Sequence, residues 1–213
     1  MLFPMEKARQ VIVVHGGETH ASYDDYLAYL RTVPFDPFEE RGKSWRDLLP
    51  ETLGEGFSVI APKMPCKQNA KYAEWSIWFR RLVPFLEDGA LLIGHSLGGV
   101  FLAKFLSEEE LPVRIAGLFL VAAPFDEEDA PYSLADFSLT ERVHTAAERC
   151  GRIYIYHSKD DPVVPFADAE KYARVFPEAA VRRLDGRGHF SDAEFSEIIS
   201  DMKKCAEAYG KNH

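Results

Sequence analysis

A serine flanked by glycines follows an apolar stretch near the middle of the sequence. Residues 94–98 read Gly-His-Ser-Leu-Gly, directly after the apolar run 90–93. A strand that breaks into so sharp a turn holds its serine in a strained backbone conformation, which requires small residues two positions before and after it. Apolar residues then recur at helical spacing over 97–108. This strand-turn-helix setting predicts that Ser96 is a nucleophile.

A serine hydroxyl needs a histidine base and a carboxylate that orients this base. Two later loops offer both, in the order acid then histidine. Residues 152–157 predict a buried strand, and the loop after it contains Asp160 and Asp161. Residues 180–184 predict another strand, which is followed by a glycine-flanked turn with His189. We therefore expect His189 to be the base and one of the two aspartates to be the acid.

Serine chemistry on a carbonyl also needs donors for the oxyanion. The first is expected to be the backbone N–H of Leu97, the residue after the nucleophile. The second should come from the loop after the first predicted strand, residues 10–15. Two glycines in that loop let the backbone approach a substrate closely. Gly17 is therefore the expected second donor, with Glu18 as the nearest alternative.

Short apolar stretches alternate with helical patterns along the chain, which predicts an α/β fold with a six-stranded, mainly parallel sheet and helices on both faces. The carboxyl ends of such strands are where open α/β sheets place their ligand sites. The expected strands are 10–15, 57–62, 90–94, 115–121, 152–157 and 180–184. The expected helices are 22–31, 44–53, 70–86, 97–108, 138–149, 165–175 and 191–209.

Two connections are longer than ordinary loops. Residues 32–50 begin with a proline-rich, aromatic part at 32–43, and residues 124–137 are acidic and contain prolines. Each segment is interpreted either as a lid or pocket wall or as a solvated surface loop.

Composition limits the function classes. With 213 residues and 46% hydrophobic content, the chain suits a single domain spanning 1–213. A net charge of −9 argues against nucleic-acid binding, where clustered cations supply much of the affinity. No apolar run approaches the roughly 20 residues that span a bilayer, so we expect no membrane partner and a cytoplasmic protein. The cysteines at positions 66, 150 and 205 fit reduced thiols.

No cofactor or metal is expected. The glycines around Ser96 lack the Gly-x-Gly-x-x-Gly spacing of dinucleotide-binding loops. His15, Glu18 and His20 are residue types that bind metals, but their spacing matches no metal motif. His95 and His15 are interpreted as packing residues.

The sequence resembles the α/β-hydrolase superfamily, and within it the small serine hydrolases of the retinoblastoma-binding protein 9 type. The motifs that support this are Gly94-His95-Ser96, Pro62-Lys63-Met64-Pro65, Trp75-Ser76-Ile77-Trp78, Asp161-Pro162 with Pro165, and Gly188-His189-Phe190 followed by Glu194-Phe195. The resemblance implies an α/β-hydrolase fold without a large cap domain. It also implies a triad of Ser96, Asp161 and His189, so it favours Asp161 over Asp160.

The expected function is that of a serine hydrolase that cleaves small carboxylic esters through an acyl-enzyme intermediate. Thioesterase and amidase or peptidase activities use the same residues and stay open. A further alternative is a binding or scaffold protein that keeps the fold and triad but acts through an unknown protein partner.

Overall fold

A six-stranded sheet forms the centre of the molecule. A computed structural model describes residues 7–38, 42–128, 130 and 132–212. The strand order is β2-β1-β3-β4-β5-β6, and each pairing between described neighbours is parallel. The strands are β1 (Arg9–Val14), β2 (Phe57–Ile60), β3 (Ala90–His95), β4 (Ile115–Val121), β5 (Cys150–Ser158) and β6 (Ala180–Leu184). The predicted parallel sheet is confirmed.

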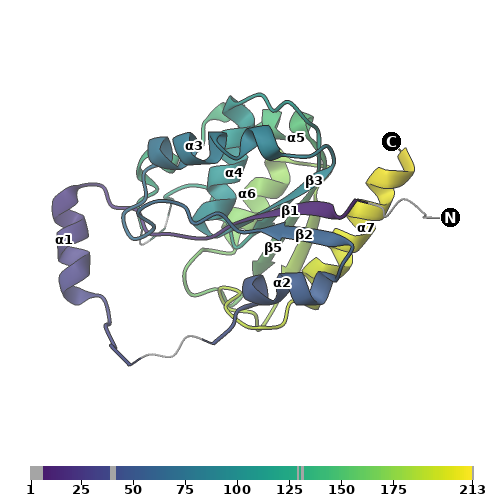
Figure 1. The fold of residues 1–213 in the computed structure, drawn as a ribbon. Coiled ribbons are helices and arrows are strands. Elements are labelled where there is room, and N and C mark those ends of the chain that lie inside the picture. The colour runs from purple at the N-terminus through teal and green to yellow at the C-terminus, as the bar shows by residue number, and fades with distance from the viewer. Residues whose placement is uncertain (1–6, 39–41, 129, 131, 213) are drawn as a thin grey trace.

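Helices cover both faces of this sheet. They are α2 (Trp45–Leu53), α3 (Tyr72–Arg80), α4 (Leu97–Glu108), α5 (Ala146–Arg149), α6 (Ala167–Val175) and α7 (Ser196–Asn212). A further helix, α1 (Tyr23–Thr32), lies apart from the sheet and covers neither face (Figure 1). Residues of α3, α4, α5 and α6 pack with Ile12 and Val14 in one apolar cluster. Residues of α2 and α7 pack with Val11 and Val13 in a second cluster on the opposite face. The alternation along β1 thus supplies two cores, one on each side (Figure 1).

The order of the strands creates a crevice. The chain passes from β1 to β2 on one side and then returns to β3 on the other side of β1. Loops that leave the carboxyl ends of β1 and β3 therefore run in opposite directions, and the gap between them is the usual ligand site of an open α/β sheet. The loops that contain His15 and Ser96 both begin here.

Two predicted helices are shorter than expected. Instead of one helix over 70–86, α3 ends at Arg80 and a 3₁₀ turn follows at Val83–Phe85. Pro84 lies in that turn, where it has no N–H for an α-helical bond and its ring would clash with the carbonyl four residues earlier. Over 138–149, a 3₁₀ turn at Glu141–Thr145 precedes the short α5. The Thr145 hydroxyl donates to the carbonyls of Ser107 and Arg142, so local side-chain bonds compete with the helix.

The last helix starts five residues later than predicted, at Ser196 rather than at 191. Trp45 explains this difference. Its backbone N–H donates to the carbonyl of Asp192, and its indole Nε1–H donates to the carbonyl of Phe190, both at 2.9 Å. These contacts hold residues 190–192 as a loop. The strands predicted at 10–15 and 57–62 end at Val14 and Ile60, before the turns that form the site.

The two long segments differ from each other. In the segment 32–50, the described part of 32–38 is mostly exposed, whereas residues 45–50 belong to α2, where Trp45 and Leu49 are buried. By contrast, the segment 124–137 is fixed to the body of the protein: Phe125 N–H donates to the buried Asp168, and Asp126 pairs with Lys171 at 2.6 Å. Residues 39–41, Asp129 and Pro131, which belong to these segments, lie outside the described residues.

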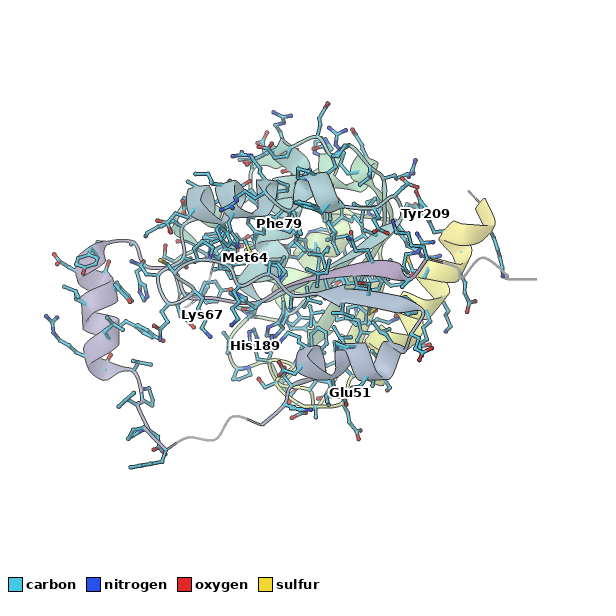
Figure 2. All side chains as sticks on the ribbon, in the orientation of Figure 1. Glu51, Met64, Lys67, Phe79, His189 and Tyr209 are labelled. Carbon is cyan, nitrogen blue, oxygen red and sulfur yellow. The ribbon has the colours of Figure 1, made fainter. Side chains whose placement is uncertain are left out.

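Within the described part of the chain, no helix is both long and apolar enough to cross a membrane. The three cysteines are free thiols, and Cys150 and Cys205 are buried whereas Cys66 is exposed. Figure 2 shows the side chains on this frame, with His189 and Lys67 near one end of the sheet and Tyr209 near the other.

Candidate active site

Ser96 lies in a tight turn between β3 and α4. Its backbone has φ 53° and ψ −125°, in a region that residues with a side chain rarely adopt. A Cβ added to Gly98 would lie 2.6 Å from the carbonyl oxygen of His15, and one added to Gly94 would lie 2.5 Å from the Cα of Gly99. Both glycines are therefore required, because backbone occupies the space that a side chain would need. The turn presents the Ser96 side chain at the crevice.

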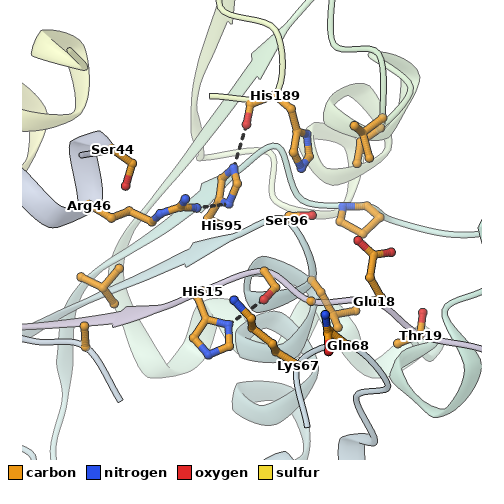
Figure 3. Close-up of a pocket in the computed structure, with 18 of the residues that line it drawn as sticks. His15, Glu18, Thr19, Ser44, Arg46, Lys67, Gln68, His95, Ser96 and His189 are labelled. Carbon is orange, nitrogen blue, oxygen red and sulfur yellow. Dashed lines mark hydrogen bonds between the residues drawn. The ribbon is translucent and has the colours of Figure 1, made fainter. Parts of the chain in front are cut away.

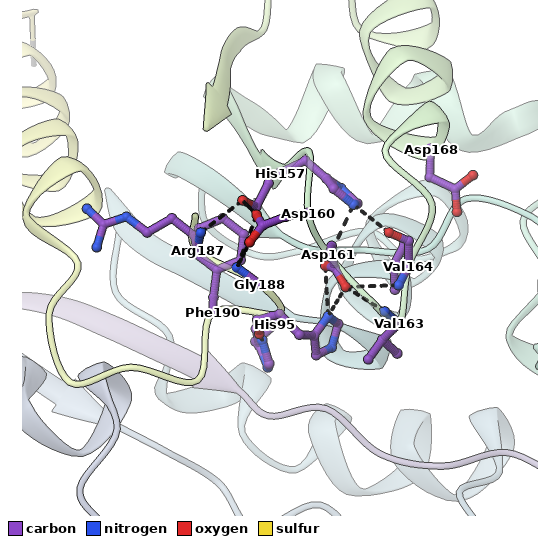
Figure 4. Close-up of polar contacts among 12 residues, drawn as sticks. His95, His157, Asp160, Asp161, Val163, Val164, Asp168, Arg187, Gly188 and Phe190 are labelled. Carbon is purple, nitrogen blue, oxygen red and sulfur yellow. Dashed lines mark hydrogen bonds and ion pairs between the residues drawn. The ribbon is translucent and has the colours of Figure 1, made fainter. Parts of the chain in front are cut away.

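His189 is hydrogen-bonded to Asp161. Its Nδ1 lies 2.9 Å from Oδ2 and 3.1 Å from Oδ1 of the carboxylate. The Asp161 side chain is fully buried, and its Oδ1 also accepts from the N–H groups of Val163 and Val164 at 2.8 and 3.0 Å (Figure 4). A carboxylate that accepts from Nδ1–H leaves Nε2 of the imidazole as a free acceptor.

The neighbouring Asp160 has different contacts. It is exposed, accepts from the Ser158 hydroxyl, and accepts from the Gly188 N–H at 3.3 Å. The hydrogen bond from Ser158 lowers the pKa of Asp160. Asp160 thus connects the loop after β5 to the loop that contains His189, whereas Asp161 contacts the imidazole itself.

Ser96 and His189 line the same cavity, which has a volume of about 1090 Å³ (Figure 3). His15, Gly16, Gly17 and Leu97 also line it. The structure therefore brings the predicted residues Ser96, His189, Leu97 and Gly17 to one cavity, with Asp161 bonded to His189. Among the described residues, no hydrogen bond joins Ser96 Oγ to His189.

The expected oxyanion donors lie on two sides of Ser96. Leu97 is the first residue of α4, where backbone N–H groups have no partner within the helix. A Cβ on Gly16 would lie 3.1 Å from the Cβ of Ser96, so this loop runs directly beside Ser96. The N–H of Glu18 donates to the carbonyl of Lys67 at 2.7 Å, which leaves Gly17 as the better candidate.

His15 holds this loop in place. Its Nδ1–H donates to the Gly16 carbonyl at 2.6 Å, and its Nε2 accepts from the Met64 N–H at 3.0 Å. Burial lowers the pKa of His15, and the positive charges of Lys67 and Arg46 add to this effect. A neutral ring is what these two bonds require, since one nitrogen donates and the other accepts.

His95 connects α2 to the loop of His189. Arg46 donates to its Nδ1, and its Nε2–H donates to the backbone carbonyl of His189 at 2.9 Å (Figure 3). Burial lowers the pKa of His95 well below its ordinary value, and the charge of Arg46 adds to this. His95 is therefore a neutral link that holds the backbone of the proposed base.

Comparisons with known proteins agree with this arrangement. The model of the family described as serine hydrolase matches residues 39–199. The chain belongs to the serine hydrolase family. Serine hydrolase RBBP9 of Rattus norvegicus is 25% identical over 156 residues, which cover 70% of this chain and 77% of that protein. The protein YdeN of Bacillus subtilis (strain 168) is 24% identical over 147 residues, which cover 67% of this chain and 75% of YdeN.

Solved structures show the fold of this serine hydrolase. The crystal structure of the ydeN gene product from B. subtilis has a TM-score of 0.74 at 20% identity and covers 93% of this chain and 98% of its own. The ferulic acid complex of Est1E from Butyrivibrio proteoclasticus has a TM-score of 0.62 at 17% identity, with coverage of 94% and 89%. The fold is that of the α/β-hydrolases, without a large cap in the described residues.

Sequence reasoning missed two residues of the serine hydrolase's cavity, Arg46 and Lys67. Arg46 lies in the first turn of α2, a helix that the sequence predicts, but no local pattern shows that this turn faces the crevice. Lys67 belongs to an irregular loop after β2. In the part of the chain that the structure describes, no group of His, Cys, Asp or Glu side chains could hold a metal ion.

Proposed function

We propose that this serine hydrolase cleaves small carboxylic esters through Ser96, His189 and Asp161. The observation that supports it best is the pairing of two features in one cavity. One is a serine on a strained turn, and the other is a histidine whose Nδ1 is bonded to a buried carboxylate. This is the combination that activates a serine hydroxyl.

In the first step, Ser96 Oγ attacks the ester carbonyl carbon while Nε2 of His189 takes the hydroxyl proton. The new C–O bond converts the carbonyl into an oxyanion. The N–H groups of Leu97 and Gly17 are the proposed donors to that oxygen. Asp161 keeps the proton of the imidazole on Nδ1 and stabilises the imidazolium that forms.

The oxyanion then collapses, the bond to the leaving alcohol breaks, and His189 returns the proton to the alcohol oxygen. Water attacks the resulting acyl-enzyme with His189 again acting as base, which releases the acid and regenerates Ser96. Thioesters and amides can follow the same steps. We propose a small substrate because the described residues form no large cap that would enclose a large one.

A fluorophosphonate probe tests this proposal, since it reacts with an activated serine. We expect wild type to be labelled and Ser96→Ala to show no labelling and at least a 10³-fold loss of ester hydrolysis. Ser58→Ala is a matched control, because Ser58 is exposed on β2 at the edge of the sheet. Equal labelling of wild type and Ser96→Ala would contradict the assignment of the nucleophile.

Absence of labelling and of hydrolysis in correctly folded wild type would favour the scaffold alternative. A panel of matched acetyl ester, thioester and anilide substrates distinguishes the three chemistries. The ester is expected to have the highest kcat/KM after correction for its uncatalysed rate.

A further inference from the structure

The cavity in front of Ser96 is richer in cations than the rest of the protein. Two carboxylates and four cationic side chains line it, in a chain whose net charge is −9. The carboxylates are Glu18 and Asp47, and the cations are Lys43, Arg46, Lys63 and Lys67. A positive cavity on a negative protein concentrates anions at that place.

Two of these charged side chains already have partners within the protein. Asp47 accepts from the backbone N–H and the hydroxyl of Ser44, both at 2.8 Å, at the start of α2. Lys43 pairs with Glu51 at 3.5 Å, on the exposed side of the same helix. The imbalance that remains at the cavity therefore comes from the other cations.

Arg46 is the most constrained of these cations. It is partly buried, and burial lowers its pKa. Its guanidinium donates to Nδ1 of His95, which is a neutral group, and it forms no ion pair with a described carboxylate. A guanidinium has several N–H donors, and cations removed from water are normally paired. Among the described residues, the charge of the Asp47 carboxylate acts on Arg46, but Asp47 forms no ion pair with it and is bonded to Ser44, so the guanidinium keeps N–H donors for a further anion.

Lys67, in the loop after β2, also lines the cavity. Figure 3 shows Arg46 and Lys67 extending toward the region beside Ser96 and His15, while Glu18 lies on the other side of Ser96. The positive charges of Lys67 and Arg46 both lower the pKa of His15. Lys67, like Arg46, has no ion pair with a described carboxylate. The cavity therefore has a cationic side and an acidic side, with the serine between them.

We propose that the preferred substrate is an ester that also bears a carboxylate, which binds Arg46 and Lys67 while the ester carbonyl lies at Ser96. This rests on the proposed function and specifies its substrate class. A planar guanidinium suits a carboxylate, because two N–H groups can donate to its two oxygens. The acidic side near Glu18 repels the same carboxylate, so the substrate binds in one orientation.

The test compares two pairs of esters that differ in one carboxylate. In the first pair, the mono(4-nitrophenyl) ester of glutarate carries the carboxylate in its acyl chain, and 4-nitrophenyl pentanoate lacks it. In the second pair, the acetyl ester of 4-hydroxybenzoate carries the carboxylate in its leaving group, and phenyl acetate lacks it. We expect kcat/KM to be at least tenfold higher for the anionic member of at least one pair, mainly through KM. The preference should fall when NaCl screens the charges.

Variants identify the residues responsible. Arg46→Met and Lys67→Met should each lower the anionic-to-neutral ratio of kcat/KM at least fivefold, and Arg46→Lys should lower it less than Arg46→Met. The ratio matters because Arg46 also contacts His95, so its loss can slow every substrate. Lys211→Met removes the same charge from the exposed end of α7 and should leave the ratio as in wild type.

Two outcomes separate this inference from the proposed function. If wild type has equal kcat/KM for the neutral and the anionic ester of both pairs, and Ser96→Ala hydrolyses none of them, the substrate inference is wrong and the serine mechanism stands. If Ser96→Ala keeps full activity on both members of a pair, the proposed function itself is wrong. A ratio that the Arg46→Met and Lys67→Met variants leave unchanged also overturns the inference.

Discussion

The turn at Ser96 and the helix α1 are opposite extremes of the same molecule. Around the turn, backbone atoms of β1, β3 and α4 approach so closely that Gly94 and Gly98 have no room for a methyl group. In α1 no residue is buried, and Tyr23 and Leu30 are 67% and 42% exposed. The contrast shows that Ser96 is placed by close backbone packing, whereas α1 contributes little to the core.

The largest effect should separate two adjacent aspartates. Asp161→Asn is expected to lower kcat by about 10³–10⁴-fold with little change in KM, because an amide cannot hold the Nδ1–H tautomer of His189. Asp160→Asn should lower kcat only a few-fold, since its remaining carbonyl oxygen can still accept from Ser158 and Gly188. Both are measured with one ester substrate. The reverse ranking would move the acid to Asp160.

Two leucines test the contrast between helices. Leu49 of α2 is fully buried, and Leu49→Ala should lower the free energy of unfolding by about 2–5 kcal/mol. Leu30→Ala in α1 should change it by less than about 0.5 kcal/mol, because the Leu30 side chain is partly exposed and α1 has no buried residue. Urea unfolding of both variants gives the comparison. A large loss from Leu30→Ala would show that α1 is part of the cooperative core.

Two glycine-to-alanine substitutions test the close packing at the turn of Ser96. Gly98→Ala is expected to lower the free energy of unfolding by about 1–3 kcal/mol or more, since the added methyl group would meet the backbone of the loop after β1. Gly56→Ala is the control, because nothing lies within 4 Å of a Cβ at that position. It should change the stability by no more than about 0.5 kcal/mol. Similar losses for both would refute the argument from close backbone packing.

The buried histidines predict a dependence of stability on pH. Burial lowers the pKa of both His95 and His157 in the folded protein, so the unfolded chain takes up protons first as pH falls. The contribution of these histidines to the free energy of unfolding is constant above the pKa of histidine in the unfolded chain, about 6.5. Below that pH it is lost by up to about 1.4 kcal/mol per pH unit for each histidine.

Urea unfolding at pH 7.5 and 5.5 measures this loss. His157→Gln keeps a donor for the carbonyl of Val164 but does not titrate, so its stability should depend less on pH than that of wild type. An unchanged pH dependence in this variant would exclude His157 as a source.

Much of the fold could be predicted because its signals are local. The strands β1, β3 and β4 are buried on both faces, so they appear in the sequence as continuous apolar stretches rather than alternating ones. The glycines around Ser96 are equally local, since the turn itself excludes side chains. The predicted ends of helices are less accurate where a contact distant in sequence determines them. For example, Trp45 holds residues 190–192 outside α7.

The candidate site divides in the same way. Ser96, Asp161 and His189 each follow a predictable strand, and the parallel sheet brings the ends of these strands together. Arg46 and Lys67 could not be predicted, because their positions depend on how α2 and an irregular loop pack against the crevice. Side chains that belong to loops and helix ends respond to tertiary contacts that no local spacing encodes.

The first turn of α2 contacts the loop of His189 through two side chains. Trp45 holds the loop that contains Phe190, and Arg46 reaches the carbonyl of His189 through His95. One helical turn therefore lines the cavity and also supports the proposed base. In a redesign of specificity, Trp45 and Arg46 are poor positions for free variation, because changes there also remove contacts that hold the loop of His189. Broader libraries belong at Lys63 and Lys67, whose loop has no contact with the backbone of His189 among the hydrogen bonds of the described residues.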